Sequence, residues 1–202
     1  LPAMFEGPLT ESIIQRAREA DLLKIRVHDL RPFGVGKYKQ VDDRPYGGGA
    51  GMLFMCEPVV NAIETLTKEG IKAGFKKPHR IYLSPRGKRL TQVKVERLAK
   101  KHEWIMLLCG HYEGIDQRIL DGGWIDEEVS IGDYVLTGGE LPAMVLIDAV
   151  SRHLPGVLGK DSSVEERRVA SSAVYTRPET ILYKAKRYKI PPVLKTGHHE
   201  KI

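Results

Sequence analysis

The chain has 202 residues, of which 42% are hydrophobic and 29% are charged, as in an ordinary globular protein of one large or two small domains. Its two cysteines, Cys56 and Cys109, have no further Cys or His at metal-ligand spacing, which excludes a disulfide framework and a cysteine-based zinc site. The longest apolar run, 144–150, is too short to span a bilayer, and no signal peptide opens the chain. We therefore expect a cytoplasmic protein without a membrane partner.

The net charge of +6 is concentrated in the last part of the chain. Residues 152–202 contain eleven Lys and Arg against five Asp and Glu, so that residues 1–151 are neutral overall. Such an asymmetry favours a polyanionic partner, in the first place a nucleic acid, that is bound by one region. A solvated surface that is merely rich in lysine is the alternative.

The first third of the chain predicts two helices, one strand and one long loop. Apolar residues at helical spacing predict an amphipathic helix over 11–23, and the alternating segment 24–30 predicts a strand. Residues 31–51 are polar and rich in glycine, and a loop of this length inside a compact domain is usually functional or mobile. A second helix is expected over 57–68, with Pro58 in its first turn.

The middle of the chain alternates strands with helices. Strands are predicted over 80–83, over the apolar run 104–108, which we expect to be buried in a parallel sheet, and around 129–136. Between them, Thr91 is expected to cap a helix that continues through His102, and an apolar helix is expected over 140–154. This order predicts an α/β fold with a mainly parallel sheet and helices on both of its faces.

The regular pattern ends near residue 158, and this defines the expected domain organisation. We expect one compact α/β domain over 1–158 and a flexible linker over 159–174, where the residues are polar, charged and small. Residues 175–202 are basic, and we expect them to be the truncated start of a second domain.

Three glycine-bearing turns follow predicted strands, at 84–87, 109–114 and 130–139. Because ligands bind at the carboxyl ends of strands in α/β sheets, three such turns point to a pocket more than to ordinary turns. Neither the G-x-G-x-x-G fingerprint nor a phosphate-binding loop is present. Loops rich in backbone groups, with Glu113 and Tyr134, favour a nucleoside over a triphosphate.

A fourth glycine-rich segment, at 41–51, begins with two aspartates. Asp42 and Asp43 beside Arg44 are suited to hold a metal or to order a substrate. An Asx-type turn in a flexible lid explains the same residues, and the sequence does not decide between the two.

Several longer segments together carry a resemblance to a known family. They are VDDRPYGGGAGM (41–52), YLSPRG (82–87), CGHYEGIDQR (109–118), SIGDYVLTGGELPAM (130–144), SRHLPGVLG (151–159), YTRPE (175–179) and PPVLKTGHHEKI (191–202). In these segments the chain resembles the bacterial tRNA (guanine-N1-)-methyltransferase family, which belongs to the SPOUT class of methyltransferases with a C-terminal trefoil knot. The resemblance covers nearly the whole chain.

The resemblance implies a fold, a reaction and partners. The three glycine-bearing loops would form the knot and hold S-adenosylmethionine, whose methyl group would pass to N1 of the guanosine immediately 3′ of a tRNA anticodon. The enzyme would be a homodimer with its sites at the subunit interface, and its activity would require Mg²⁺. A knot is an exception to the rule that chains avoid threading, so periodicity does not predict it.

The resemblance also assigns site residues. Arg152 would stabilise the negative charge that grows on O6 of the base, and Glu166, with Glu165 beside it and Asp161 further off, lies nearest to the expected general base. Substrate binding would involve Asp42, Asp43 and Gly51. The cofactor would be bound by Tyr82, Leu83, Ser84, Pro85, Gly87, Gly110, Tyr112, Glu113, Gly114, Ser130, Ile131, Gly132, Asp133, Tyr134, Val135, Leu136, Gly138, Gly139 and Pro142.

One departure from the family pattern keeps another interpretation open. The segment 160–174 is shorter than usual around the general base. The alternative is therefore a non-catalytic relative that binds S-adenosylmethionine and RNA but has lost its base. A lesser departure is His111, which stands where arginine is common. A small-molecule or protein methyltransferase is disfavoured by the basic C-terminal section and by YTRPE.

Overall fold

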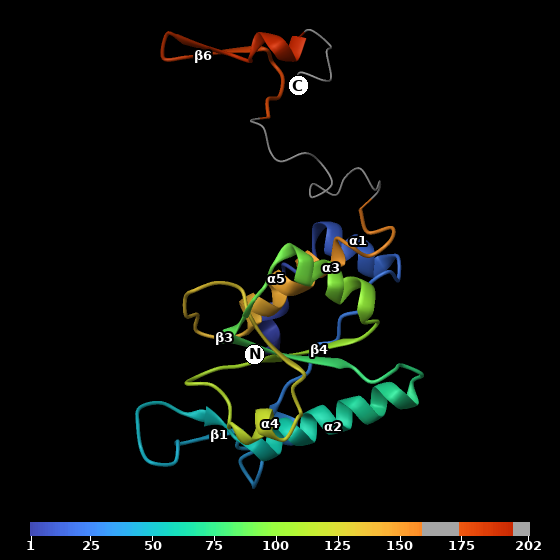
Figure 1. Cartoon of the computed structure of the whole chain (residues 1–202), viewed down its shortest axis with the longest axis vertical. Coiled ribbons are helices and arrows are strands. Elements are labelled where there is room, and N and C mark those ends of the chain that lie inside the picture. The colour runs from blue at the N-terminus through green and yellow to red at the C-terminus, as the bar shows by residue number, and fades with distance from the viewer. Residues whose placement is uncertain (159–173, 196–202) are drawn as a thin grey trace. The chain divides into compact units, whose positions relative to one another are not determined.

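The computed structural model describes residues 1–158 and 174–195, and the chain divides into two units, 1–163 and 164–202. The first unit is built from helices and strands in the order shown in Figure 1. They are α1 (Ser12–Glu19), β1 (Asp42–Asp43), β2 (Leu53–Phe54), α2 (Cys56–Lys72), β3 (His79–Arg89), α3 (Gln92–Lys101), β4 (Ile105–Cys109), α4 (Arg118–Asp121), β5 (Glu127–Ser130) and α5 (Glu140–Ser151).

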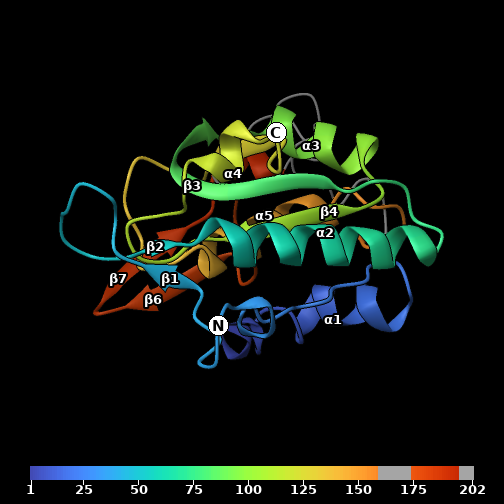
Figure 2. The same cartoon turned by 90° about the horizontal axis from the view of Figure 1, so that it is seen from below.

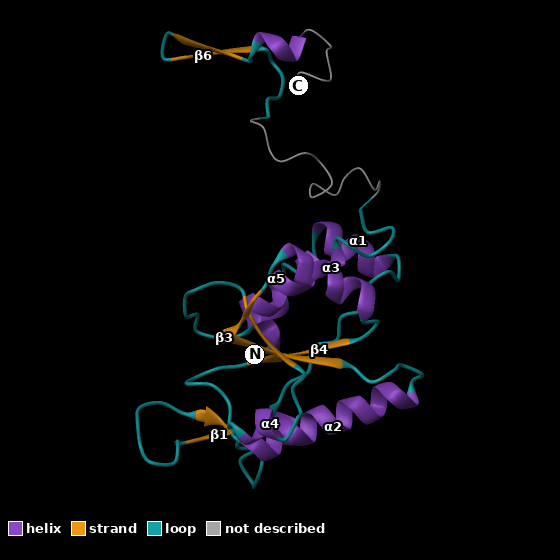
Figure 3. Ribbon diagram, in the orientation of Figure 1, coloured by secondary structure: helices purple, strands orange, loops and turns teal. Residues whose placement is uncertain are grey.

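The main sheet is parallel, as the sequence predicts. Its strands lie in the order β4-β3-β5, and Ile81 of β3 is paired with Leu107 on one side and Glu127 on the other. A separate antiparallel pair joins β1 to β2. Helices α3 and α5 lie on one side of the sheet and α2 and α4 on the other (Figure 3), and α2 is in front of the strands when they are seen from below (Figure 2).

The alternation of side chains along β3 creates a core on each face of the sheet. Ile81 and Leu83 are buried among residues that include Leu98 of α3 and Leu146 of α5. Tyr82, which lies between them, is buried with Val59 of α2 and other apolar side chains on the opposite face. Since successive strand residues point to opposite faces, the side chains of β3 pack against the helices on both sides of the sheet. The prediction of helices on both faces is therefore correct.

The predicted strand at 24–30 is wrong, because residues 23–29 belong to no helix, strand or bridge. Leu23 and Ile25 instead pack against the buried cluster of Leu9, Ile14 and Met144. The alternation of apolar residues that suggested a strand therefore reflects packing of alternate side chains on the core, and the backbone of this segment is not paired with a strand. The expected strand 104–108 does occur as β4, but its residues are only half buried, since β4 is an edge strand of the described sheet.

Two strand ends also differ from expectation. Residues 84–87, predicted as a turn, remain within β3 as a bulge, where the register with β5 shifts between Leu83 and Lys88. β5 ends at Ser130 and does not continue to 136. The Ser130 hydroxyl accepts a hydrogen bond from the Gly132 N–H and donates one to the Gly132 carbonyl, which turns the chain out of the sheet.

The second unit contains an antiparallel hairpin that the sequence analysis did not predict. It pairs β6 (Thr180–Tyr183) with β7 (Lys186–Lys189) and is followed by a short 3-10 helix over Pro192–Lys195. The connecting residues Lys184 and Ala185 both have a left-handed backbone conformation. Turns of this kind normally contain Asn-Gly or Asp-Gly, so the Lys-Ala sequence does not predict a hairpin here. Residues 159–173, which make up most of the predicted linker, lie outside the described residues.

Candidate active site

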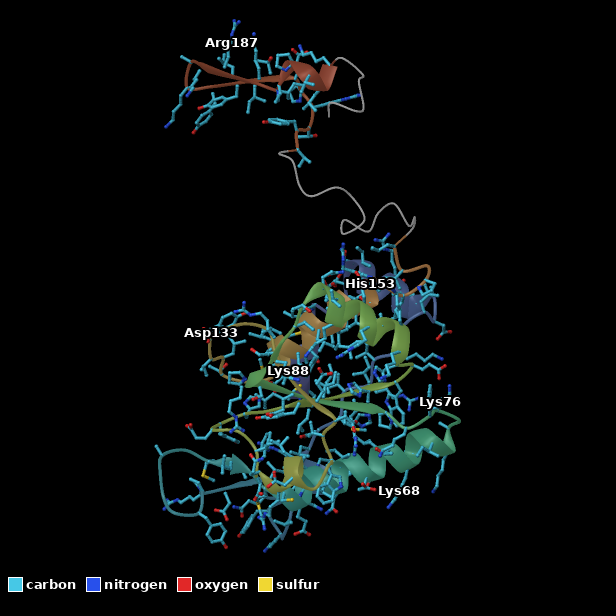
Figure 4. All side chains as sticks on the ribbon, viewed as in Figure 1. Lys68, Lys76, Lys88, Asp133, His153 and Arg187 are labelled. Carbon is cyan, nitrogen blue, oxygen red and sulfur yellow. The ribbon has the colours of Figure 1, made fainter. Side chains whose placement is uncertain are left out.

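A cavity of about 330 Å³ opens where β3, β4 and β5 approach their carboxyl ends, a volume in the range of small-ligand sites. The bulge of β3 and the loops that follow β4 and β5 form its walls. Of the predicted cofactor residues, all line this cavity except Gly87 and Asp133. Asp133 is exposed and lies on the loop that projects from the main body of the unit (Figure 4).

Four lining residues were not among the predicted cofactor residues: Arg86, His111, Val129 and Thr137. Each lies within, or next to, a segment that carries the resemblance, so position alone could have suggested them. Gly87 does not line the cavity but is needed for the packing of β3 against β5. A Cβ at Gly87 would lie 2.5 Å from the Val129 nitrogen, so glycine is what allows the bulge of β3 to rest on β5.

The cavity walls depend on close approach of main chain to main chain. The Gly139 N–H donates to the Gly110 carbonyl at 2.8 Å, and His111 forms an antiparallel bridge with Gly138. A Cβ at Gly139 would lie 2.7 Å from the Cys109 Cα, and a Cβ at Gly110 would lie 2.9 Å from the Tyr82 ring. Backbone donors and acceptors can therefore reach a ligand here without intervening side chains.

Tyr82 lies in β3 and packs against the glycine-bearing loops. Its side chain is 4% exposed, and burial raises the pKa of its hydroxyl, although the nearby Arg86 acts in the opposite direction. Tyr82 thus stays protonated as a hydrogen-bond donor at neutral pH. Burial also raises the pKa of the neighbouring Cys109 thiol to about 12, so this cysteine is an unreactive part of the core.

A buried carboxylate stands next to the two glycine loops. Glu140 is 1% exposed, and its Oε1 lies 2.6 Å from His111 Nε2 and 2.9 Å from the α-amino group of Leu1. Burial alone would raise the pKa of Glu140, but these two hydrogen bonds outweigh it and the pKa is lowered. Glu140 is therefore a buried anion at neutral pH.

The segment with the two aspartates reaches the edge of the cavity through its last residues. The Glu113 N–H donates to the Met52 carbonyl, and a Cβ at Gly51 would lie 2.5 Å from Glu113 Cγ. Asp42 and Asp43 lie in β1, away from the cavity lining, and the Asp43 carboxylate accepts a hydrogen bond from the N–H of the next residue, Arg44. Within residues 1–158 and 174–195, no group of three or more His, Cys, Asp or Glu could hold a metal ion.

The predicted catalytic residues are not gathered at this cavity. Arg152 follows the last turn of α5, whereas Gly139 and Pro142 line the cavity at its first turn. At about 1.5 Å per helical residue, some 15 Å separate Pro142 from Arg152. No described residue forms a side-chain ion pair with Arg152. Glu165, Glu166 and Asp161 lie outside the described residues.

The fold and the cavity define an α/β protein with a site for a nucleoside-sized ligand at the carboxyl edge of a parallel sheet. The model of the tRNA (Guanine-1)-methyltransferase TrmD family matches residues 1–202. The chain belongs to this family, which confirms the resemblance seen in the sequence.

Individual relatives agree with this assignment. The chain is 48% identical over 206 residues to the tRNA (guanine-N(1)-)-methyltransferase of Alkaliphilus oremlandii, with 100% of this chain and 80% of the relative covered. It is 49% identical over 205 residues to the protein of that name from Haemophilus influenzae strain PittGG, covering 100% and 79%. The crystal structure of the tRNA (m1G37) methyltransferase from Aquifex aeolicus superposes with a TM-score of 0.78 at 36% identity, covering 98% of this chain and 80% of that one.

Proposed function

We propose that this protein transfers a methyl group from S-adenosylmethionine to N1 of the guanosine immediately 3′ of the anticodon in tRNA. The observation that carries the proposal is the cavity at the glycine loops, in a chain of this family. The alternative of a non-catalytic relative is not favoured, because the relatives that match the whole chain are named as methyltransferases.

S-adenosylmethionine is the cofactor that membership of this family implies, and the cavity fits it. The crowded positions of Gly110 and Gly139 form a cradle that any Cβ would fill, which suits the close approach of an adenosine group to the main chain. When bound, the cofactor supplies a methyl group that its sulfonium has already activated. The protein's task is then to align the groups that react and to exclude water.

The remaining chemistry concerns the proton on N1 of the base. The attacking N1 loses this proton, and a carboxylate at Glu166 or Glu165 is proposed to accept it. Negative charge grows on O6 in the same step, and the guanidinium of Arg152 is proposed to stabilise it. Both roles rest on the family resemblance.

Arg152 lies far from the cavity of its own chain, but in a homodimer it could lie beside the cavity of the partner. α5 is apolar around much of its circumference, and Leu141 and Val145, one turn apart, are 47% and 46% exposed. Val135, beside the cavity, is 81% exposed. An apolar helix in water is usually covered by a partner. We therefore propose that Arg152 of one protomer serves the cavity of its partner.

Mixing two inactive variants tests this arrangement. Arg152→Ala is expected to lower kcat by roughly 10²- to 10³-fold, as for loss of a charge-stabilising donor, and Gly139→Ala is expected to weaken cofactor binding roughly 10- to 100-fold, so that it is nearly inactive when the cofactor is limiting. Heterodimers of the two variants contain one intact composite site and should recover activity. If Arg152 acted at the cavity of its own chain, each site of the heterodimer would carry one of the two defects, and mixing would restore nothing.

The C-terminal hairpin supports contact with tRNA. Its residues 184, 186, 187 and 189 are all Lys or Arg, and none forms an ion pair with a described residue. Tyr183 is 63% exposed and Tyr188 is 46% exposed, and each has a lysine ammonium near its ring. Cations that neutralise phosphates and aromatic rings that stack on bases are the usual means of binding RNA.

Further parts of the proposal rest on the family alone. We propose that the three glycine-bearing loops form a trefoil knot and that residues 1–158 are the cofactor domain. Residues 159–174 would be a linker, and 175–202 would begin the tRNA-binding element. Mg²⁺ is proposed to support activity, with Asp42 and Asp43 helping to place the ion or the RNA. The protein is proposed to act in the cytoplasm; no helix within the described residues is long and apolar enough to cross a membrane.

The decisive experiment is methyl transfer from labelled S-adenosylmethionine to two tRNA transcripts. One transcript carries guanosine immediately 3′ of the anticodon, and the other carries adenosine there. We expect label in the first transcript alone. Binding of both ligands without transfer to either transcript would overturn the proposal and revive the non-catalytic alternative.

A further inference from the structure

The contact between His111 and Glu140 joins two walls of the cavity through side chains. His111 lies in the loop after β4, and Glu140 begins α5 immediately after the loop that follows β5. We propose that His111 is a positioning residue for the cofactor, which holds these two loops in register through its contact with Glu140. The inference rests on the proposed function, because it assumes that the cavity binds S-adenosylmethionine.

The geometry couples this pair directly to the cavity backbone. His111 also forms the backbone bridge with Gly138, so one residue joins the two loops through its main chain and through its imidazole. A Cβ at Gly138 would lie 2.6 Å from Glu140 Oε2 and 2.7 Å from His111 Cε1. The pair therefore packs on the backbone of a residue that lines the cavity, and a shift of either side chain must move that backbone.

The burial of Glu140 explains why its contact with His111 should matter. Glu140 is buried, and its Oε2 has no hydrogen-bond partner among the described residues. Its Oε1 lies 2.6 Å from His111 Nε2, and the rings of Phe54 and Tyr112 lie beside His111. A buried carboxylate that loses its partner is strongly disfavoured, so Glu140 should hold the His111 side chain in place.

A double-mutant cycle in cofactor affinity tests the pair. The dissociation constant of S-adenosylmethionine is measured by calorimetry for the wild-type protein, His111→Ala, Glu140→Gln and the double variant. Each single change is expected to weaken binding about tenfold, and the double variant should be hardly weaker than either single one, as for residues that act through one contact. Thermal unfolding of each variant checks the fold, and His111→Ala carries the test if Glu140→Gln does not fold.

Rescue by a conservative variant supplies a readout that a purely structural role would not move. His111→Arg keeps a side-chain donor for Glu140, so it should bind S-adenosylmethionine nearly as tightly as the wild type, whereas His111→Ala should bind about tenfold more weakly. The matched control is His79→Ala, which removes another His–Glu contact, 3.3 Å from His79 Nε2 to Glu127 Oε2, at the opposite end of β3 and away from the cavity.

The outcomes separate this inference from the function on which it rests. Equal affinity of wild type and His111→Ala, additive effects in the cycle, or binding by His111→Arg as weak as that of His111→Ala would each overturn the inference alone. A wild-type protein that does not bind S-adenosylmethionine would overturn the proposed function and the inference with it. Weaker binding in His79→Ala to the same extent would also contradict the inference, because the effect would then not be specific to the cavity.

Discussion

The two ends of the parallel sheet hold polar groups of different kinds. At the amino end, charged side chains satisfy one another: the Arg80 guanidinium donates two hydrogen bonds to Asp126, and Glu127 lies within ion-pair distance of His79, Lys94 and Arg97. At the carboxyl end the polar groups that line the cavity belong largely to the main chain of glycine-bearing loops. The amino end therefore stabilises the fold, while the carboxyl end has groups available for a ligand.

This difference gives a general expectation for variants of the protein. Changes at the amino end should lower the free energy of unfolding and leave ligand binding intact at temperatures where the protein is folded. Changes at the carboxyl end should weaken ligand binding and leave the free energy of unfolding nearly unchanged. The reason is that much of the cavity is bordered by loops and its glycines contribute little to the core. Each prediction below tests one side of that expectation.

The largest effect on binding is expected for Gly139→Ala. Its Cβ would lie 2.7 Å from the Cys109 Cα and 2.8 Å from the Gly110 nitrogen, and these backbone atoms cannot move without opening the cavity wall. Displacement of this wall should weaken cofactor binding roughly 10- to 100-fold, which is about 1.4–2.7 kcal/mol of binding free energy. Calorimetry with S-adenosylmethionine measures this loss.

The matched control is Gly132→Ala in the same cavity. There the added Cβ would meet only the ring of Tyr134, whose side chain is 55% exposed and can turn away. Its effect on affinity should be much smaller. Equal losses in the two variants would show that crowding of the main chain is not what shapes the site.

The largest effect on stability is expected for Asp126→Asn. Arg80 is 6% exposed, and without the carboxylate its buried guanidinium would lack a counter-charge. We expect a loss of roughly 2 kcal/mol in the free energy of unfolding, below the value for a fully buried pair because Asp126 is partly solvated. The control is Asp116→Asn, which breaks a similar contact to the exposed Arg118 and should cost less. Denaturant titration measures both.

The Arg80–Asp126 pair also predicts a dependence of stability on pH. The hydrogen bond from Arg80 lowers the pKa of Asp126 below its ordinary value of 3.8. The stabilisation is therefore complete above the unfolded-state pKa and is lost as pH falls through the lower folded-state pKa. The difference in unfolding free energy between wild type and Asp126→Asn should shrink below about pH 4. A constant difference down to pH 2 would contradict this assignment.

The hairpin of the second unit extends the comparison, because its cations are not used up in ion pairs with described residues. Arg187 projects from the hairpin, as labelled in Figure 4. Changing Lys186 and Arg187 together to Gln should weaken tRNA binding roughly fivefold and reduce its salt dependence by about 1.5 in the logarithmic slope. Cofactor affinity should not change. Changing Lys100 and Lys101 of α3 to Gln removes the same charge and should have a smaller effect on both quantities.

The smallest effect is expected for Thr91→Ala. The Thr91 hydroxyl accepts a hydrogen bond from the Lys94 N–H and caps α3. Loss of the cap should lower the free energy of unfolding by about 1 kcal/mol. The affinities for S-adenosylmethionine and tRNA should stay at their wild-type values, and a change in either would extend the site to this helix.

The sequence predicted the parallel architecture and the place of the cavity because both depend on local signals. The helical spacing of apolar residues indicates α1, the apolar run indicates α5, and the Thr91 cap is visible in the chain. The bulge of β3 was not predictable, since it depends on Gly87 meeting β5, which is distant in sequence. The failed strand at 24–30 has the same cause, because packing on the core produces the alternation that pairing also produces.

The sequence could identify the residues of the site but not the contacts between them. The residues that line the cavity could be named from their motifs, whereas the His111–Glu140 contact joins residues 29 positions apart that no local pattern connects. The position of Arg152 relative to the cavity follows from the direction of α5, which the sequence does not give. Spatial relations of this kind depend on tertiary packing and not on propensity.

The close packing of main chain around Gly110 and Gly139 has a consequence for how this protein could evolve resistance to an inhibitor. A competitive inhibitor that binds backbone groups in this cavity would offer few side chains whose replacement weakens it. Substitution of either glycine would weaken binding of the inhibitor by displacing the wall, and would weaken binding of the natural ligand for the same reason. Escape would then have to come from changes in side chains at the rim, such as Tyr134 and Val135, which an inhibitor can be shaped to avoid.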